Sequence, residues 1–369
     1  MPRPRELSDA RHVGREAVVT VGSCSKFFAL TLAIAPALGA VPAFAQTPTI
    51  AEVAAYQGTD RTQRLIAGAK KEKAVMVYGS TVAEDMRPVS DAFRKRYGID
   101  FQYWRASSEQ LVQRAVNEHR AGRCAVDAFA TVAAELETLH REKLLIAVKT
   151  PAAADLAPLA HRPHGEWVAT RLNIFSASFN TNLVKREEAP RKYEDLLDPR
   201  WKGRLAVEAA DFDWFGTLVM KMGEEKGLKL FRNIVQTNGM SVRRGHTLLA
   251  NLVQAGEVPL ALTVYSYKPE QQKRDGAPVE PLYLSPVVAL GYGPAVSRCA
   301  PHPHAALLFH DFMIREGQEI MAKRDMTPTN PKIRPLPDGV DLTMIDPVEM
   351  LDNRKKWDEL WTNIVLKPR

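Results

Sequence analysis

Residues 74–104 read AVMVYGSTVAEDMRPVSDAFRKRYGIDFQYW, and this stretch decides the fold class. Its first part, AVMVYGS (74–80), is a short apolar run rich in β-branched and aromatic residues, which predicts a buried strand. The segment AEDMRPVSDAFRKRYG (83–98) has apolar residues at helical spacing and closes on Gly98, a typical helix stop. IDFQYW (99–104) predicts a second strand. A strand, a helix and a strand in this order indicate a pair of parallel strands with a covering helix.

The alternation continues to residue 145. A helix is expected over SSEQLVQRAVNEHRAG (107–122), a third strand over CAVDAFATV (124–132) and a third helix over AAELETLHREKLL (133–145). This order predicts an α/β fold with a mostly parallel sheet flanked by helices. Such sheets bind ligands beyond the carboxyl ends of their strands. The turn at Gly79, Ser80 and Thr81 lies at one of these ends.

A second set of strands and helices follows. Strand material lies in WVATRLNIFSASFNT (167–181), VPLALTVYSY (258–267) and SPVVALGYGPAVS (285–297), and DWFGTLVMKMGEEKGLKLFRNIV (213–235) is strongly helical. The C-terminal segment 346–365 carries an apolar stripe at helical spacing. We find no internal repeat. A chain of 369 residues is large for one hydrophobic core, so two lobes are expected.

The N-terminus predicts export. Lys26 precedes an apolar run, FFALTLAIAPALGA (27–40), which is too short to span a membrane, and Ala43 and Ala45 occupy the small-residue positions of a signal-peptidase site. We therefore expect residues 1–45 to be a cleaved signal peptide. The remaining chain has a net charge of +5 with interspersed signs, and it lacks the basic runs of a nucleic-acid surface. Its two cysteines, Cys124 and Cys299, could pair in an oxidising compartment, but the sequence leaves this open.

A second candidate ligand-binding turn lies in RRGHTLLANLVQAGE (243–257). Apolar residues at Leu248, Leu249, Leu252 and Val253 have helical spacing, and Thr247 stands where a helix cap is expected. The first turn of a helix exposes N–H groups that attract anions. The stretch is either a capped surface helix or half of an anion-binding site.

The order of these segments resembles periplasmic solute-binding proteins of ABC importers, in the branch that binds ferric iron. The resemblance rests on YEDLLDPRWKGRL (193–205), LVQAGEVPLALTVY (252–265), GAPVE (276–280) and, above all, APHPHAALLFHDFMIREGQEIM (300–321). It implies a two-lobe fold with crossing hinge strands. Lobe one would hold 46–171 plus 286–332 and lobe two 172–285 plus 333–369. It also implies a periplasmic location, a small-molecule ligand, and a permease and an ATPase as partners. We expect a monomer that binds no nucleic acid.

This layout would place two helix starts opposite each other across a cleft. Ser80 and Thr81 belong to lobe one, and Gly245, His246 and Thr247 to lobe two. We therefore expect an anion clamp that closes when both halves contact the ligand. The ligand would be a small anionic solute or an iron complex.

Direct binding of ferric iron is the alternative. The resemblance implies two tyrosines as hard oxygen ligands, and Tyr265 and Tyr267 stand at the matching position with Ser266 between them. The histidine expected after the first strand and the acidic residue expected after the third strand are absent at their places. Ferric iron is thus expected at most as a ligand, and no cofactor is expected.

Other polar and aromatic residues complete the expected cleft. Asn173 lies at the crossing, Ser107 begins a helix after the second strand, and Asp213 and Trp214 begin another helix after a strand. His302 and His304 are interpreted as residues of a helix start rather than metal ligands. The sequence contains no Gly-x-Ser-x-Gly, His-Glu-x-x-His or phosphate-loop motif, so we do not expect an enzyme.

Overall fold

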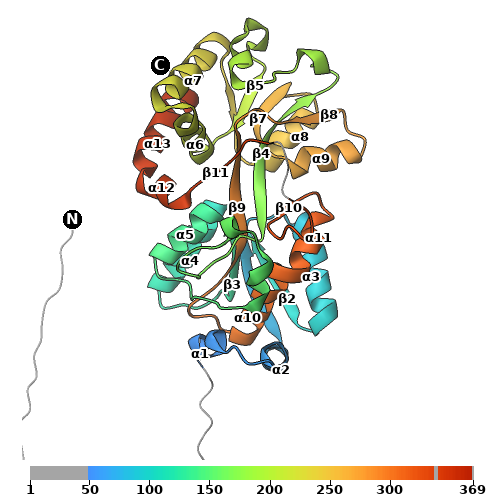
Figure 1. The fold of residues 1–369 in the computed structure, drawn as a ribbon, viewed down its shortest axis with the longest axis vertical. Coiled ribbons are helices and arrows are strands. Elements are labelled where there is room, and N and C mark those ends of the chain that lie inside the picture. Colours follow the sequence, from blue (N-terminus) through green and yellow to red (C-terminus); the bar gives the residue numbers. More distant parts are fainter. Residues whose placement is uncertain (1–48, 336–339, 368–369) are drawn as a thin grey trace, which may run out of the picture. The chain divides into compact units, whose positions relative to one another are not determined.

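The computed structural model describes residues 49–335 and 340–367, and the expected signal peptide lies outside these ranges. The first three strands and their helices follow the expected alternation (Figure 1). β1 pairs in parallel with β2 on one side and with β3 on the other. The α/β prediction for this half, which we call lobe one, is therefore confirmed. Its elements are α1 (Ile50–Ala55), α2 (Arg61–Glu72), β1 (Ala74–Gly79), α3 (Ala83–Tyr97), β2 (Asp100–Arg105), α4 (Ser108–Arg120), β3 (Ala128–Val132) and α5 (Ala133–Arg141).

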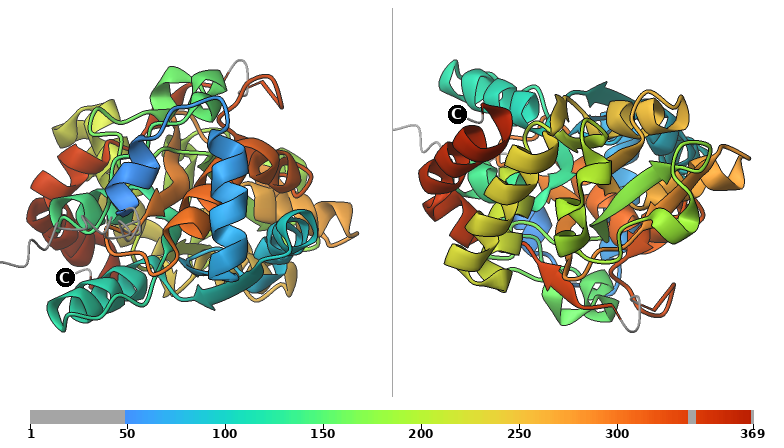
Figure 2. Two further views of the ribbon diagram at one scale, coloured as in Figure 1. Left: turned by 90° about the horizontal axis from the view of Figure 1, so that it is seen from below. Right: turned by 90° about the horizontal axis from the view of Figure 1, so that it is seen from above.

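Helices cover both faces of this sheet. On one face α2, α3 and α10 (Pro303–Phe312) bury an apolar cluster that includes Leu65, Phe93 and Phe309. On the other face α4 and α5 bury a second cluster around Leu111 and Leu136. Seen from below in Figure 2, the blue α2 lies in front of the strands. A π-helical turn (Met313–Gly317) joins α10 to α11 (Gln318–Ala322).

The second half, lobe two, repeats this design. β7 pairs in parallel with β5, and β5 in parallel with β6. Its largest apolar cluster lies among α6, α7 and the C-terminal helices, which lie beside α7 in the right view of Figure 2. The elements are β5 (Leu205–Glu208), α6 (Phe212–Met222), α7 (Glu224–Asn238), β6 (Ser241–Arg243), α8 (His246–Gln254), β7 (Leu260–Tyr265), α9 (Tyr267–Arg274), β8 (Val279–Leu282), β11 (Leu342–Met344), α12 (Pro347–Asp352), α13 (Arg354–Trp361) and the π-helical Thr362–Leu366.

Two long strands connect the halves. β4 (Arg171–Asn180) and β9 (Val287–Val296) are buried along their whole length and pair antiparallel with each other. β4 pairs with β9 up to Ile174 and with β7 from Phe175 onward, so the strand changes partners in mid-course. β9 continues to β3 of lobe one. The short β10 (Thr327–Pro328) pairs with the start of β4. Short 3₁₀ turns occupy Pro151–Asp155, Pro158–Ala160, Arg186–Glu188, Tyr193–Leu197 and Pro199–Trp201.

A disulfide joins Cys124 and Cys299, whose Cα atoms lie 5.6 Å apart. The sequence left this pairing open, and the fold resolves it, because β3 and β9 are neighbours and each cysteine lies just beyond one of them. The bond links two parts of lobe one that are 175 residues apart in the chain. Among the described residues, no helix is both long and apolar enough to cross a bilayer.

Candidate functional site

The carboxyl ends of the parallel strands carry the polar side chains of the candidate site. In lobe one these ends lead to Ser80 and Thr81 after β1 and to α5 after β3; in lobe two they lead to Asp211, His246 and Tyr265. Because parallel strands end at a common edge, residues that are distant in sequence come together there. Two groups result, which we call the acidic group and the basic group.

The acidic group lies in lobe two and comprises Glu208, Asp211, Asp213, His246 and Tyr265. Asp211 Oδ1 lies 3.0 Å from Nε2 of His246, and one donor atom each of Glu208, Asp211 and His246 lies within 4.8 Å of the others. The ring of Tyr265 stacks on His246 with centroids 4.0 Å apart. Asp211 Oδ2 is buried and lacks a hydrogen-bond partner among the described residues. Such an arrangement of oxygen and nitrogen donors is suited to a cation.

The buried carboxylates of the acidic group favour a positively charged ligand. Burial, followed by the charge of Asp211, raises the pKa of Asp213 to about 7 and raises the pKa of Glu208. Burial alone would lower the pKa of His246, but the charge and hydrogen bond of Asp211 outweigh it and the net shift is upward. Burial also holds the pKa of Tyr265 well above its ordinary value. The phenol therefore carries its proton at neutral pH.

The basic group comprises Arg171, at the start of β4, and the three side chains that surround its guanidinium, Thr81, Tyr267 and Tyr292. Arg171 is only 3% exposed, its guanidinium donates to Thr81 Oγ1 at 3.0 Å, and it lies 3.8 Å from the ring centroid of Tyr292 and 5.8 Å from that of Tyr267. Its Nε lacks a partner, and the described part of the chain offers it no carboxylate. A buried cation without a counter-charge favours a bound anion.

A chain of hydroxyls lies beside this group in lobe one. Thr131 Oγ1 is 3.1 Å from the hydroxyl oxygens of both Ser80 and Ser108. Thr81 donates its proton to Tyr292 at 2.7 Å. Tyr265 and Tyr267, whose rings are 6.3 Å apart and nearly parallel, bring the acidic and basic groups together.

The structure corrects the expected role of the helix start at residue 245. The cap of α8 is Gly245, with φ of 98°, and Thr247 lies inside the first turn. The N–H of Gly245 donates to Glu208 Oε1 at 2.8 Å, so a carboxylate of the chain itself already occupies this helix start. The expected anion-binding half in lobe two is therefore acidic instead.

Other predicted residues have structural contacts. Ser107 caps α4 by accepting from the N–H of Gln110, and Thr81 is held by Arg171 and Tyr292. Trp214 is fully buried in the core of lobe two against Phe231. An aromatic residue that follows a strand can pack in a core or line a cleft, and its position in the sequence does not distinguish the two. We therefore exclude Trp214 from the candidate ligand contacts.

The remaining predicted residues lie within or beside the two groups. Asp213 does not cap α6, whose cap is Asp211, but accepts from the N–H of Trp214 at 2.7 Å. Asn173 is buried on β4, and its Oδ1 lacks a partner among the described residues.

His302 and His304 stand at the start of α10 as interpreted, each beside a carboxylate.

The predicted site residues did not include Arg171, Glu208 and Thr131, and they represented the segment of Asp211 only by Asp213 and Trp214. Glu208, Asp211 and Thr131 stand at the carboxyl ends of parallel strands, and that position is a signal that could have identified them. Glu135, in the first turn of α5, also belongs here. Its Oε2 is buried and finds no hydrogen-bond partner in residues 49–335 and 340–367, and burial followed by the charge of Asp213 raises its pKa to about 7. Glu135 of lobe one thus faces the acidic group of lobe two.

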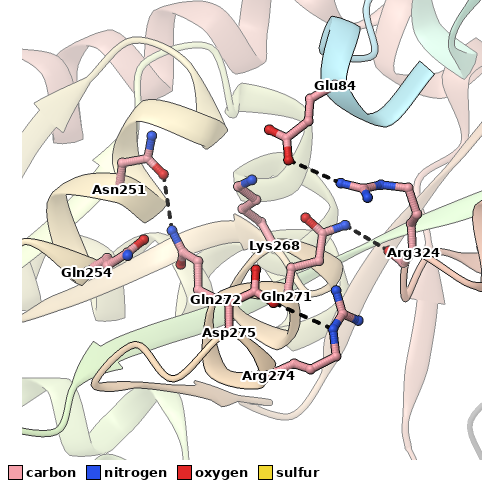
Figure 3. Close-up of a pocket in the computed structure, with 9 residues that line it drawn as sticks. All are labelled: Glu84, Asn251, Gln254, Lys268, Gln271, Gln272, Arg274, Asp275 and Arg324. Carbon is pink, nitrogen blue, oxygen red and sulfur yellow. Dashed lines mark hydrogen bonds and ion pairs between the residues drawn. The ribbon is translucent and has the colours of Figure 1, made fainter. Parts of the chain in front are cut away.

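A separate polar cavity of about 260 Å³ lies where α9 meets lobe one (Figure 3), and neither Arg171 nor any residue of the acidic group lines it. Gln271 donates to the carbonyl of Arg324 at 2.9 Å, and Arg274 forms an ion pair with Asp325. Arg324 itself is held by Asp85 at 2.5 Å. The bonds of Gln271 and Arg274 connect the two lobes directly, whereas the Arg324–Asp85 pair lies within lobe one. The cavity is lined by Glu84, Asn251, Gln254, Lys268, Gln271, Gln272, Arg274, Asp275 and Arg324.

Comparison with known proteins gives a consistent result. Residues 136–346 match the family described as bacterial extracellular solute-binding protein. The chain is 23% identical over 316 residues to an Fe(3+)-binding periplasmic protein of Serratia marcescens, covering 80% of this chain and 91% of the relative. It is 27% identical over 176 residues to a putative 2-aminoethylphosphonate-binding periplasmic protein of Salmonella typhi, covering 46% of this chain and 50% of that protein.

Among solved structures, the periplasmic binding protein AfuA from Actinobacillus pleuropneumoniae, with fructose-6-phosphate bound, has a TM-score of 0.71 at 20% identity. The match covers 80% of this chain and 99% of AfuA. At this identity the likeness shows the fold alone, and that fold is the expected two-lobe architecture. With more than half of its residues in the family match, this chain belongs to the bacterial extracellular solute-binding proteins.

Proposed function

We propose that the chain is the periplasmic component of an ABC importer, which delivers a small solute to a permease and its ATPase. The solute would bind between lobe one (46–171 plus 286–332) and lobe two (172–285 plus 333–369). Family membership supports the solute-binding role, and the periplasmic relatives support the location. The leader at 1–45 would direct export, and the mature chain would act as a monomer without catalysis.

The two charged groups support a more specific proposal about the solute. The single observation that carries it is the buried Arg171, which has no counter-charge among the described residues and is linked to the acidic group through the rings of Tyr267 and Tyr265. A solute that satisfies both must carry an anionic group and a cationic centre. A metal complexed by a small anion meets this requirement, and so does a zwitterion with an amine and a phosphonate. The name of the Serratia relative contains a metal, ferric iron, and the name of the Salmonella relative contains a zwitterion, 2-aminoethylphosphonate.

Direct binding of ferric iron is a second candidate, and one observation favours it. The histidine and the acidic ligands that are missing after the strands of lobe one have counterparts in lobe two, where His246, Asp211 and Glu208 lie together beside Tyr265. Phenolate, carboxylate and imidazole form a reasonable donor set for a hard trivalent ion. Under this proposal, metal binding would displace the proton of Tyr265.

A thermal-shift comparison tests both candidates. The full chain, Arg171→Met and Asp211→Asn would each be titrated with ferric chloride, ferric citrate, 2-aminoethylphosphonate and inorganic phosphate. A ligand at a thousand times its Kd adds about 4 kcal/mol of stability. Asp155→Asn serves as the matched control, because Asp155 pairs with Lys332 on the exposed surface.

The pattern of losses distinguishes the candidates. If both variants lose the response to ferric citrate or to the phosphonate, the proposal of a doubly charged solute is supported. A response to ferric chloride alone that depends on Asp211 but not on Arg171 would favour direct iron binding. A response to phosphate that survives Asp211→Asn would support a purely anionic solute and contradict the role of the acidic group.

A further inference from the structure

A histidine and carboxylate cluster lies in lobe one, outside the groups described above. Glu137 and His140 are one turn apart on α5, and His164 and Glu166 lie in the segment that leads to β4. His140 Nδ1 is 2.7 Å from Glu166 Oε2, and His164 Nε2 is 3.3 Å from Glu137 Oε2. The two imidazole rings stack with centroids 3.8 Å apart.

We propose that these residues form a binding site for a divalent transition metal such as Zn²⁺ or Cu²⁺. One donor atom each of Glu137, His140 and His164 lies within 4.8 Å of the others. Bonds of about 2.0–2.2 Å require donors roughly 3.3 Å apart in a tetrahedral site. The donors must therefore approach each other by about 1.5 Å at most, which side-chain rotation supplies. Glu166 is available as a fourth ligand.

Charge and burial support the same site. The side chains of Glu137, His164 and Glu166 are 5%, 18% and 15% exposed, so water solvates them only in part. Two carboxylates and two neutral imidazoles carry a charge of −2; Arg298, whose Nη2 lies 3.8 Å from Glu166 Oε1, offsets part of it, and a divalent ion would offset the rest. Imidazole nitrogen with carboxylate oxygen suits Zn²⁺ and Cu²⁺ better than Mg²⁺ or Ca²⁺.

Neighbouring groups hold these ligands in position. The indole N–H of Trp167 donates to Glu137 Oε2 at 3.3 Å, and the N–H of Glu166 donates to His164 Nδ1 at 3.0 Å. Because His164 Nδ1 accepts this bond, the neutral ring carries its proton on Nε2, 3.3 Å from Glu137 Oε2, and a metal that binds Nε2 must displace this proton. Outer contacts of this kind orient metal ligands.

Other histidines of lobe one lack this arrangement. His304 lies beside the carboxylate of Glu72, and His302 beside that of Asp127, each as a single ring. The stacked pair differs because two protonated rings in contact would repel each other, which favours neutral rings. Neutral imidazoles are the form that binds metal.

A metal here would connect α5 to the segment that continues into β4, so it would stabilise lobe one without contacting the solute. The test is isothermal titration of the full chain with Zn²⁺ in two buffers of different protonation enthalpy. We expect one equivalent, accompanied by proton release, that disappears in His164→Asn and weakens at least tenfold in Glu137→Gln. Glu137→Gln keeps an acceptor for Trp167, so it guards against a loss caused by misfolding.

Two further variants serve as controls. His304→Asn should retain this equivalent, because His304 stands apart from the cluster. His246→Asn removes a donor of the acidic group, so any zinc lost in that variant belongs to the solute site. With Cu²⁺, electron paramagnetic resonance should show coupling to two imidazole nitrogens in His246→Asn. Equal zinc binding by the wild-type chain and by both His164→Asn and Glu137→Gln would overturn the proposal.

Discussion

Replacement of Arg171 by Met should affect stability and binding in opposite directions. Arg171 is 3% exposed and lacks a carboxylate partner among the described residues. Burial of an ion without its counter-charge costs several kcal/mol. Its contact with the Tyr292 ring returns about 2 kcal/mol, and its hydrogen bond to Thr81 about 1 kcal/mol. Methionine fills similar space without charge, so the free energy of unfolding of the ligand-free variant should stay level or rise by about 1–2 kcal/mol.

Binding should weaken in the same variant. A hydrogen bond to a charged ligand group contributes about 1.5–3 kcal/mol, so the Kd for an anion-bearing solute should rise about 10- to 150-fold. Denaturant unfolding of the ligand-free protein gives the first quantity and calorimetric titration gives the second.

Arg204→Met provides the matched control. Arg204 also lies over an aromatic ring, that of Trp201 at 5.7 Å, and donates to the carbonyl of Leu183, but this bond is exposed. Its loss should destabilise the protein slightly and leave binding unchanged. If Arg171→Met instead lowered the free energy of unfolding by more than Arg204→Met and left the Kd unchanged, Arg171 would be a structural residue and the basic group would not bind the solute.

Three other predictions concern pH, the disulfide and lobe closure. Because burial raises the folded-state pKa of Glu135 to about 7, this residue should lower stability by on the order of 3 kcal/mol as the pH rises from about 4.5 to 7. Glu135→Gln should remove this contribution in melts at pH 5 and pH 8 and leave that of Asp213, whose pKa is also about 7. Reduction of the Cys124–Cys299 bond should lower the free energy of unfolding by up to about 5 kcal/mol in the chain-entropy model, since it closes a loop of 175 residues; an unchanged denaturation midpoint after reduction would contradict this. Gln271→Ala should remove a bond between the lobes, weaken binding about 5- to 10-fold and give a larger radius of gyration at subsaturating solute. Arg274→Ala should have a smaller effect, because its ion pair with Asp325 is half-exposed.

Much of the architecture was predictable because periodicity and helix stops act locally. The strand at 74–79 and the helix at 83–97, which ends at Gly98 in the left-handed region, lie close to where the sequence predicts them. The site was less predictable, because its residues interact over long sequence distances. The local sequence around Gly245 and His246 predicts an anion site, but in the fold Glu208 and Asp211, more than 30 residues earlier, lie beside them. Likewise, no local pattern distinguishes a buried Arg171 from a solvated arginine, or a core Trp214 from one that lines a cleft.

The disulfide has a topological consequence. The segment between Cys124 and Cys299 contains β4, β9 and every strand of lobe two except β11. In the oxidised protein, most of lobe two is thus a covalent ring that is closed on the body of lobe one. A protease that cuts once within this ring, for example at the exposed turn near Lys202, opens the backbone but releases no fragment. The nicked chain should migrate as one species without reductant and as two with it, so the oxidised protein would remain a single molecule after a cut that would divide a reduced chain.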